Sequence, residues 1–269
     1  MDSNKLPRAC FTKLSIALHQ FDFTSTKSDA SVFTRLTTTL ATYILIYLDD
    51  ILVTGTSESD ITALMAQLHN TFSLKDLGEM YYFFGIEVSS SSIGTFILKQ
   101  TKYIIELLKK SDMINAKPVP TPMTSSLNLS TFGDRTFNNH ILYRFIVGGL
   151  RYAIITRPEI SFSVNKVAQF LHSPLESHWK VIKQILRYLA GTIRHDLRFS
   201  KFINFRIYGF CDSDWASDVD DRKSTNGFAI YLGLKLVSWA TRKQTAASKS
   251  STKAEFRGIS DVVTEIIWL

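Results

Sequence analysis

The run Thr42–Gly55, TYILIYLDDILVTG, places two adjacent aspartates between two apolar segments. Each segment is short and rich in Ile, Leu, Val and Tyr, which is typical of a buried strand. A hairpin of these strands would expose Asp49 and Asp50 at its turn, at the edge of a sheet. Because adjacent carboxylates repel each other, a hard cation with oxygen ligands, such as Mg²⁺, is their natural neutraliser. The alternative is an ordinary Asp-Asp turn.

Length and composition indicate a globular, moderately basic protein. The 269 residues suffice for two modest domains or one large one. The net charge of +7 suits an anionic partner, nucleic acid above all. Cys10 and Cys211 lie far apart without metal-ligand spacing, which favours a reducing compartment. The sequence has no membrane-span-like apolar run and no signal-peptide core, so we expect a soluble protein of the cytoplasm or nucleus.

The first part of the chain alternates helical and strand patterns before its character changes. Apolar residues recur at helical spacing in 8–20, 58–71 and 100–111. A second hairpin is expected from the aromatic run 81–88 and the short strand 95–98. Residues 115–139 then contain three prolines in KPVPTP, followed by Thr, Ser, Asn and Gly. This composition predicts a surface linker and the best candidate domain boundary.

Helical patterns resume at 143–156, 160–172 and 176–190. The last of these carries an apolar stripe and a basic one, and the basic stripe consists of Lys180, Lys183 and Arg187. A basic stripe is usually a solvated helix face. It is also suited to a phosphate backbone, which binds cationic side chains irrespective of base sequence. The sequence leaves both interpretations open.

From residue 205 the pattern becomes that of three strands followed by a helix over 250–269. Asp212 and Asp214 stand at the end of the first strand, and Glu255 stands in the first turns of the helix. Such a unit can bring these acids onto one face, where they would hold divalent metals that hydrolyse a phosphodiester. Solvated turn acids are the alternative. Three further acids are expected in a solvated loop: Asp218, Asp220 and Asp221.

These patterns resemble the C-terminal part of the reverse transcriptase–ribonuclease H polyprotein of copia-type LTR retrotransposons. The matching stretches run nearly end to end, and their order and spacing make the resemblance specific. They include PRACFTKLS (7–15), YLDDILVTG (47–55), FSLKDLGEMYYFFGIEV (72–88), TKYIIELLKKSDM (101–113), KPVPTPM (117–123), YRFIVGGLRYAIITRPEISFSV (143–164), ILRYLAGT (185–192), CDSDWASDVDDRKSTNGFAIYLG (211–233) and SSTKAEF (250–256).

The resemblance implies an α+β chain in four parts. Residues 1–114 would form part of the reverse-transcriptase palm and thumb, and 115–139 a linker. Residues 140–200 would form a helical connection, and 201–269 the N-terminal β-β-β-α part of a ribonuclease H-like domain. The implied substrates are RNA, DNA or an RNA–DNA hybrid, with Mg²⁺ as the cofactor.

The resemblance also implies residue roles. Asp49 and Asp50 would correspond to palm carboxylates that help bind catalytic Mg²⁺, and residues 81–88 to the hairpin that grips the primer. Asp212 would correspond to the first metal-binding Asp of ribonuclease H, with Asp214 as the close alternative, and Glu255 to its helix Glu. Two positions depart from the family pattern. Leu48 stands where Val is usual, and Lys253 where Glu is frequent.

A further departure concerns acids that the chemistry needs. The palm requires another Asp in an upstream strand, and neither Asp2, Asp22 nor Asp29 fits that context. The later ribonuclease H acids would fall beyond residue 269. Two-metal chemistry distributes its ligands over several carboxylates, so we expect both sites to be incomplete, and the chain to be inactive without the missing halves. The alternatives are a retained nucleic-acid-binding module without catalysis and a gene-model fragment that does not fold stably.

Overall fold

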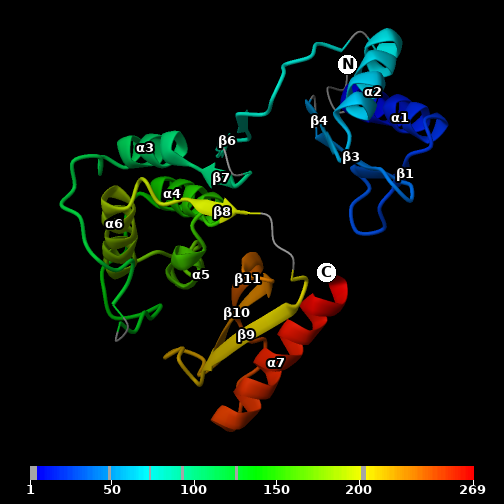
Figure 1. Cartoon of the computed structure of the whole chain (residues 1–269). Helices are drawn as coiled ribbons and strands as arrows, with labels where there is room; N and C mark the ends of the chain where they lie inside the picture. The colour runs from blue at the N-terminus through cyan, green and yellow to red at the C-terminus, as the bar shows by residue number, and fades with distance from the viewer. Residues whose placement is uncertain (1–4, 48–49, 73, 92–93, 125–126, 201–203) are drawn as a thin grey trace. The chain divides into compact units, whose positions relative to one another are not determined.

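The hairpin predicted around the two aspartates is present in the computed structural model (Figure 1). Strands β3 (Ala41–Tyr47) and β4 (Asp50–Gly55) pair antiparallel, with Tyr47 opposite Asp50. The pairing requires a glycine at the end of β4, because a Cβ on Gly55 would lie 2.8 Å from the carbonyl oxygen of Ala41. The glycine that ends the conspicuous sequence run therefore permits the close approach of its two strands.

The structure describes residues 5–47, 50–72, 74–91, 94–124, 127–200 and 204–269. The chain divides into two compact units, Met1–Met80 and Tyr81–Leu269. None of the helices in these described ranges is long and apolar enough to cross a membrane.

The first unit is a four-stranded sheet with two helices. Its elements are α1 (Lys5–Gln20), β1 (Thr24–Ser25), β2 (Val32–Leu36), β3, β4 and α2 (Glu58–Phe72), with sheet order β1-β2-β3-β4. Buried and exposed side chains alternate along β3, as expected for a strand with one covered face. The buried Ile44 belongs to one apolar core with Leu18 of α1 and Leu64 of α2. Both helices therefore cover the same face of the sheet.

A partly exposed ion pair and a hydrogen bond join α2 to this sheet. Asp60 accepts a hydrogen bond of 2.7 Å from Arg35 of β2 and one of 2.6 Å from the hydroxyl of Thr42 on β3. These hydrogen bonds, that from Thr42 first, lower the pKa of Asp60. The start of α2 is thus tied to two strands at once.

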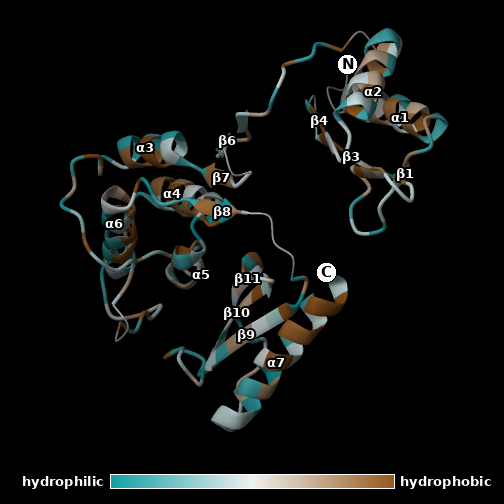
Figure 2. Ribbon diagram, in the orientation of Figure 1, coloured by the Kyte–Doolittle hydropathy of each residue, from teal (hydrophilic) through white to brown (hydrophobic). Residues whose placement is uncertain are grey.

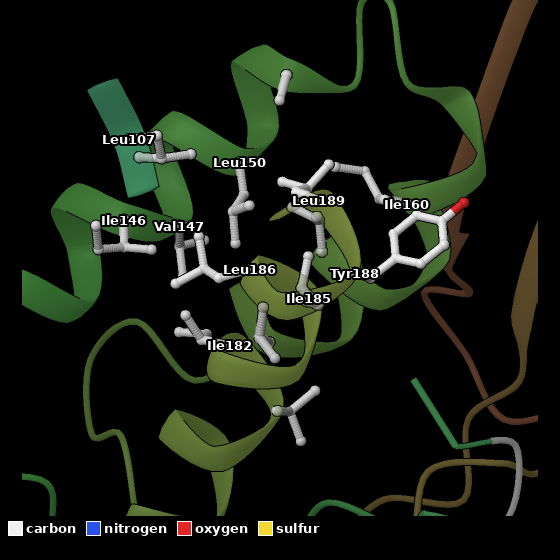
Figure 3. Close-up of a cluster of buried hydrophobic side chains, with 14 of the residues drawn as sticks. Leu107, Ile146, Val147, Leu150, Ile160, Ile182, Ile185, Leu186, Tyr188 and Leu189 are labelled. Atoms are coloured by element: carbon white, nitrogen blue, oxygen red, sulfur yellow. The ribbon is translucent and has the colours of Figure 1, made fainter. Parts of the chain in front are cut away.

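The second unit begins with the other predicted hairpin. Strands β5 (Tyr82–Phe83), β6 (Ile86–Ser90), β7 (Phe96–Lys99) and β8 (Leu197–Phe199) form one antiparallel sheet. The helices are α3 (Thr101–Lys110), α4 (His140–Ala153), the short η1 (Pro158–Ile160), α5 (Ser161–Ala168) and α6 (Glu176–Gly191). Their apolar stripes meet in one large core (Figure 3), in which Leu107, Leu150 and Leu186 are almost fully buried.

The segment 115–139 is the one that the sequence predicts to be a surface linker. It lies wholly inside Tyr81–Leu269 and packs along α6. Phe137 stacks on Trp179 with ring centroids 4.7 Å apart, and Leu129 is buried. The sequence does not indicate this packing, because the apolar residues of the proline-rich segment follow neither a helical nor a strand period.

The C-terminal part has the predicted strand-strand-strand-helix order. Strands β9 (Ile207–Asp214), β10 (Thr225–Leu232) and β11 (Lys235–Lys243) form an antiparallel sheet in the order β11-β10-β9. Helix α7 (Ser251–Trp268) lies along this sheet (Figure 1) and packs Val262 against Phe228 and Ile230. In Figure 2 the C-terminal half of α7 is largely hydrophobic, and Val263, Ile267 and Trp268 are exposed.

Candidate functional site

The first candidate site is the tip of the β3–β4 hairpin. Asp50 is the first residue of β4 and is exposed, and Tyr47, its cross-strand partner, is 47% exposed. Leu48 and Asp49 lie outside the described residues. A carboxylate at a hairpin tip is accessible to a ligand and keeps its hydration, as the sequence pattern predicted for this position.

Two upstream acids considered for the palm lie in turns. Asp22 follows α1 with a left-handed backbone (φ 63°). The Asp29 carboxylate accepts hydrogen bonds from the hydroxyl and the backbone N–H of Ser31, which lower its pKa. Both acids therefore lie in turns, and neither lies on a strand beside the hairpin tip.

The second candidate site surrounds the end of β9. The Ser213 hydroxyl donates to the carbonyl oxygen of Ala254 on α7 over 3.1 Å, so Ser213 points toward the helix. Because successive side chains of a strand point to opposite faces, Asp212 and Asp214 lie on the face away from α7. Both are exposed.

Glu255 is half-buried on α7, next to Ala254. Burial raises the pKa of the Cys211 thiol, and the charges of Glu255 and Asp212 raise it further. Both carboxylates therefore lie within electrostatic range of the same sulfur. The structure thus brings Asp212 and Glu255 to one region of the sheet, although Asp212 points to the far face.

A buried polar cluster that the sequence did not predict fixes the first turn of α7. Asn226 accepts hydrogen bonds from Ser213 at 2.8 Å and from Gln244 at 2.6 Å. Gln244 also donates to the Ala254 carbonyl at 3.0 Å, and Asn226 donates to Asp261 at 2.9 Å. These buried groups satisfy one another's hydrogen-bonding capacity, as buried polar groups must. The cluster holds the backbone beside Glu255 in place.

The donor set at β9 does not fit a metal ion. Among the residues that the structure describes, no three His, Cys, Asp or Glu side chains gather in a way that would hold one. Metals of the Mg²⁺ type take several oxygen ligands at fixed geometry, and Asp212 and Asp214 face away from the helix that carries Glu255. We therefore derive no chemical step through a metal ion.

The loop after β9 is not simply solvated, which corrects the expectation for its acids. Asp218 is only 7% exposed and pairs with Lys243 of β11 at 2.6 Å. Asp221 pairs with the same ammonium at 3.1 Å and with Lys223 at 3.0 Å. Burial raises the pKa of Asp221, but the hydrogen bonds from Lys223 and Lys243 outweigh it and lower the pKa to about 2. Asp220 is exposed but accepts hydrogen bonds from Ser130 and Thr131. Partners distant in sequence give these acids structural roles.

The three residues of the basic stripe of α6 differ in exposure and in their contacts. Lys180 and Lys183 are exposed. Arg187 instead donates from Nε to the carbonyl oxygen of Lys117 at 2.6 Å, and it holds the 115–139 segment on the helix. Two lysines thus remain for a phosphate backbone, and the arginine has a structural contact of its own.

An open groove of about 400 Å³ between α3 and α4, which the sequence did not predict, is lined by two basic residues and by the acidic Glu106. The ammonium of Lys110 lies 5.3 Å from the centre of the Phe145 ring, and Arg144 also lines the groove. Gly148 forms part of its wall, with open space where a Cβ would stand. Aromatic rings beside cations are a frequent setting for single-stranded nucleic acid.

Comparisons with known proteins agree with the resemblance. A family model described as "Reverse transcriptase (RNA-dependent DNA polymerase)" matches residues 3–125. The chain is 40% identical over 263 residues to the Retrovirus-related Pol polyprotein from transposon RE1 of Arabidopsis thaliana, covering 98% of the chain and 18% of that protein. It is 33% identical over 272 residues to the corresponding polyprotein from transposon TNT 1-94 of Nicotiana tabacum, again covering 98% of the chain, and 20% of that protein.

A shorter relative matches over nearly its whole length. The Uncharacterized mitochondrial protein AtMg00810 of Arabidopsis thaliana is 41% identical over 226 residues, which are 84% of the chain and 93% of that protein. The chain therefore spans about a fifth of the length of the Pol polyproteins and nearly all of this shorter protein. No solved structure matches the chain.

Proposed function

The chain belongs to the retrovirus-related Pol polyproteins of copia-type retrotransposons, and from this we propose that it is part of an RNA-directed DNA polymerase and ribonuclease H. Residues 1–114 would supply part of the palm and thumb, and 201–269 the first part of the ribonuclease H-like domain. Its substrates would be RNA, DNA or their hybrid.

The β3–β4 hairpin is the observation that carries this proposal. It places Asp50 at the first position of β4, opposite the exposed Tyr47, and Asp49 precedes Asp50 in the sequence. Carboxylates at an exposed hairpin tip are accessible to a metal ion that is bound at the 3′ end of a primer. Reverse transcriptases use divalent metal ions, so Asp49 and Asp50 would hold Mg²⁺, which stabilises the negative charge that develops during nucleotide addition.

We also propose that the 269 residues alone do not catalyse. The palm chemistry needs a further strand carboxylate, and Asp22 and Asp29 stand in turns with local partners or a left-handed backbone. At the other site, Asp212 and Asp214 point away from the helix of Glu255. Without several converging carboxylates, neither site has the charge and positioning of two-metal catalysis.

A primer-extension assay tests this proposal. The purified chain, a DNA primer on an RNA template and Mg²⁺ or Mn²⁺ are expected to give no extension, and the hybrid no cleavage. Mg²⁺-dependent extension that Asp49→Asn abolishes would overturn the inactivity and establish the polymerase site. Cleavage that Asp212→Asn abolishes would do the same for the ribonuclease H site.

The second candidate function is nucleic-acid binding without catalysis. The exposed Lys180 and Lys183 of α6 and the groove that contains Lys110 and Phe145 favour it. Binding through lysines to phosphates releases counterions, so affinity for an RNA–DNA hybrid should fall steeply with salt. Binding that is absent, or that does not change between low and high salt, would contradict this candidate.

A further inference from the structure

Strand β9 is the last strand in the sheet order β11-β10-β9, so its outer edge is open among the described strands. On its inner side, the N–H of Gly233 donates to the carbonyl oxygen of Arg206 at 2.8 Å, which places the backbone groups of Arg206 toward β10. Alternate residues of an antiparallel strand direct these groups to opposite sides, so Ile207, Gly209 and Cys211 direct theirs to the open edge. Such a row of outward backbone groups is a template for another strand.

Exposed apolar side chains line this open edge. Ile207, Tyr208 and Phe210 are all exposed, and Phe210 is 61% exposed. Tyr208 and Phe210 belong to the face away from α7, because Ser213 points toward the helix and side chains alternate along a strand. The eight residues of β9 include neither proline nor lysine, with which natural proteins often prevent pairing at an edge. The edge therefore has the properties of a strand that accepts a partner.

An exposed apolar stripe of α7 lies on the β9 side of the helix. The stripe consists of Phe256, Ile259, Val263 and Ile267. Glu265 accepts a hydrogen bond from Ser238 of β11, whereas Ile266 lies over β9, where a Cβ on Gly209 would lie 3.1 Å from its Cδ1. Successive helix residues advance by about 100°, and the direction from Glu265 to Ile266 continues toward the stripe. The apolar stripe therefore adjoins the open edge of β9.

The charges of β9 are complementary to those of a second β9 that runs antiparallel to it. When Phe210 lies opposite Phe210 of a second copy, each Arg206 lies opposite an Asp214. Both residues are exposed, and residues directly opposite point to the same face, so two symmetric ion pairs can form. A parallel pairing in register would instead place Asp212 and Asp214 beside their own copies, where like charges repel. The sequence of β9 thus favours antiparallel pairing with itself.

Two copies of α7 fit side by side on one face of the joined sheet. Each α7 covers both β9 and β10, since Ile266 lies over Gly209 and Val262 packs against Phe228. Neighbouring strands are about 4.8 Å apart, so two helices centred between β9 and β10 would be roughly 10 Å apart. Packed helices lie about 8–10 Å apart. The apolar stripes would then be buried against each other.

We propose that the open edge of β9 and the adjoining apolar stripe of α7 form the interface of a homodimer. The two β9 strands pair antiparallel about Phe210 and join the two three-stranded sheets into one. The occupant of the edge is a second copy of this chain. The inference concerns assembly, and it does not depend on whether the chain catalyses.

Sedimentation equilibrium of the full chain tests the dimer, which is expected at micromolar concentration. Arg206→Asp and Asp214→Arg should each weaken dimerisation at least about tenfold, because each places like charges opposite one another in both ion pairs. An equimolar mixture of the two variants should restore the dimer, since opposite charges then face each other between the copies. The control is Leu234→Lys, at a residue that is 87% exposed between β10 and β11, and it should leave the dimer intact.

Three results would overturn the homodimer. A chain that stays monomeric at every concentration would favour a strand from another protein at this edge. A dimer that neither charge variant weakens would form through a different surface. A mixture of the two variants that fails to restore the dimer would contradict the pairing of Arg206 with Asp214.

Disulfide trapping tests the register in a Cys10→Ser, Cys211→Ser background. Phe210→Cys should form a covalent dimer under mild oxidation, because the Cα atoms of such a pair lie about 4.5–5.5 Å apart, within the range of a disulfide. Tyr208→Cys, on the same strand and face, should not, because its opposite residue is Asp212 rather than its own copy. Equal trapping of the two variants, or trapping of neither, would contradict pairing about Phe210.

Discussion

The hydroxyl of Ser130 donates a hydrogen bond of 2.5 Å to the carboxylate of Asp220, 90 residues later in the chain. The same carboxylate accepts from the backbone N–H and the hydroxyl of Thr131. These hydrogen bonds lower the pKa of Asp220, that from Ser130 first. The loop after β9 is therefore tied to the segment that packs on α6.

Replacement of Asp220 should weaken this link. Asp220→Ala removes three accepted hydrogen bonds at an exposed site, and the expected loss in free energy of unfolding is about 1 kcal/mol. Denaturant unfolding of the full chain measures it. Asp220→Ala should cost less in a Ser130→Ala, Thr131→Ala background than in the wild-type chain, because only the backbone N–H of residue 131 then still donates to the carboxylate. A fully additive loss in that background would contradict the assigned partners.

The stability of the chain should decline as the pH falls below about 6.5, because of His178. Its Nδ1 accepts from the Leu175 N–H at 3.0 Å, and its Nε2 donates to the Ser130 carbonyl. Burial lowers the pKa of His178 below its ordinary value of 6.5, although the hydrogen bond to Ser130 and the charges of Asp134 and Asp220 oppose this. The neutral ring is thus favoured by folding, and its contribution is complete above pH 6.5 and lost toward lower pH.

The measurement is the free energy of unfolding between pH 7.5 and 5 in the wild-type chain and in His178→Gln, a range chosen to bracket the ordinary histidine pKa of about 6.5. The variant should be less stable at the upper end and should show a shallower decline. Equal slopes in the two proteins would show that His178 does not cause the pH dependence.

Two adjacent glycines of α4 should respond oppositely to alanine. A Cβ on Gly149 would lie 2.6 Å from Cδ1 of the buried Leu107, so Gly149→Ala must shift that side chain within the packed core and should cost about 1 kcal/mol. No atom lies within 4 Å of a Cβ on Gly148, so Gly148→Ala should add about 0.5–1 kcal/mol through helix propensity. Thermal unfolding of both variants checks the pair. A stabilising Gly149→Ala would show that α3 and α4 are not in close contact there.

A salt titration of RNA–DNA hybrid binding should distinguish the exposed Lys183 of α6 from Arg187, which contacts the Lys117 carbonyl. Lys183→Gln should lower the slope of log K against log salt by about 0.9, as expected for one lost phosphate contact, and leave the melting temperature unchanged. Arg187→Gln should instead lower the melting temperature, because it removes the donor to the Lys117 carbonyl. A larger effect of Arg187→Gln than of Lys183→Gln on the salt slope would reverse the two roles.

Much of the local structure was predictable from sequence. Alternating and short apolar runs predicted the β3–β4 and β6–β7 hairpins and the three late strands, and the helical stripes of α2, α3 and α6 were visible as well. These elements depend on residues close together in the chain. Turn glycines such as Gly94 and a side-chain period of two or 3.6 suffice to indicate them.

The contacts between distant segments were not predictable in this way. The pairing of Asp218 with Lys243, and of Asp220 with Ser130, depends on how the late sheet lies against the helices. From sequence alone, a run of aspartates in a turn is predicted to be solvated, because the partners of these residues belong to distant segments of the chain. The same holds for Ser217, which accepts a hydrogen bond from Lys166 of the earlier helix α5.

We propose that the 269 residues, which belong to the copia-type Pol polyproteins, do not polymerise by themselves. Single-turnover extension of a DNA primer on an RNA template, with the chain in excess over template and Mg²⁺ present, tests it most directly. The expected result is a protein-bound, unextended primer, identical for the wild-type chain and Asp49→Asn. Extension by the wild-type chain that is lost in Asp49→Asn would contradict the claim.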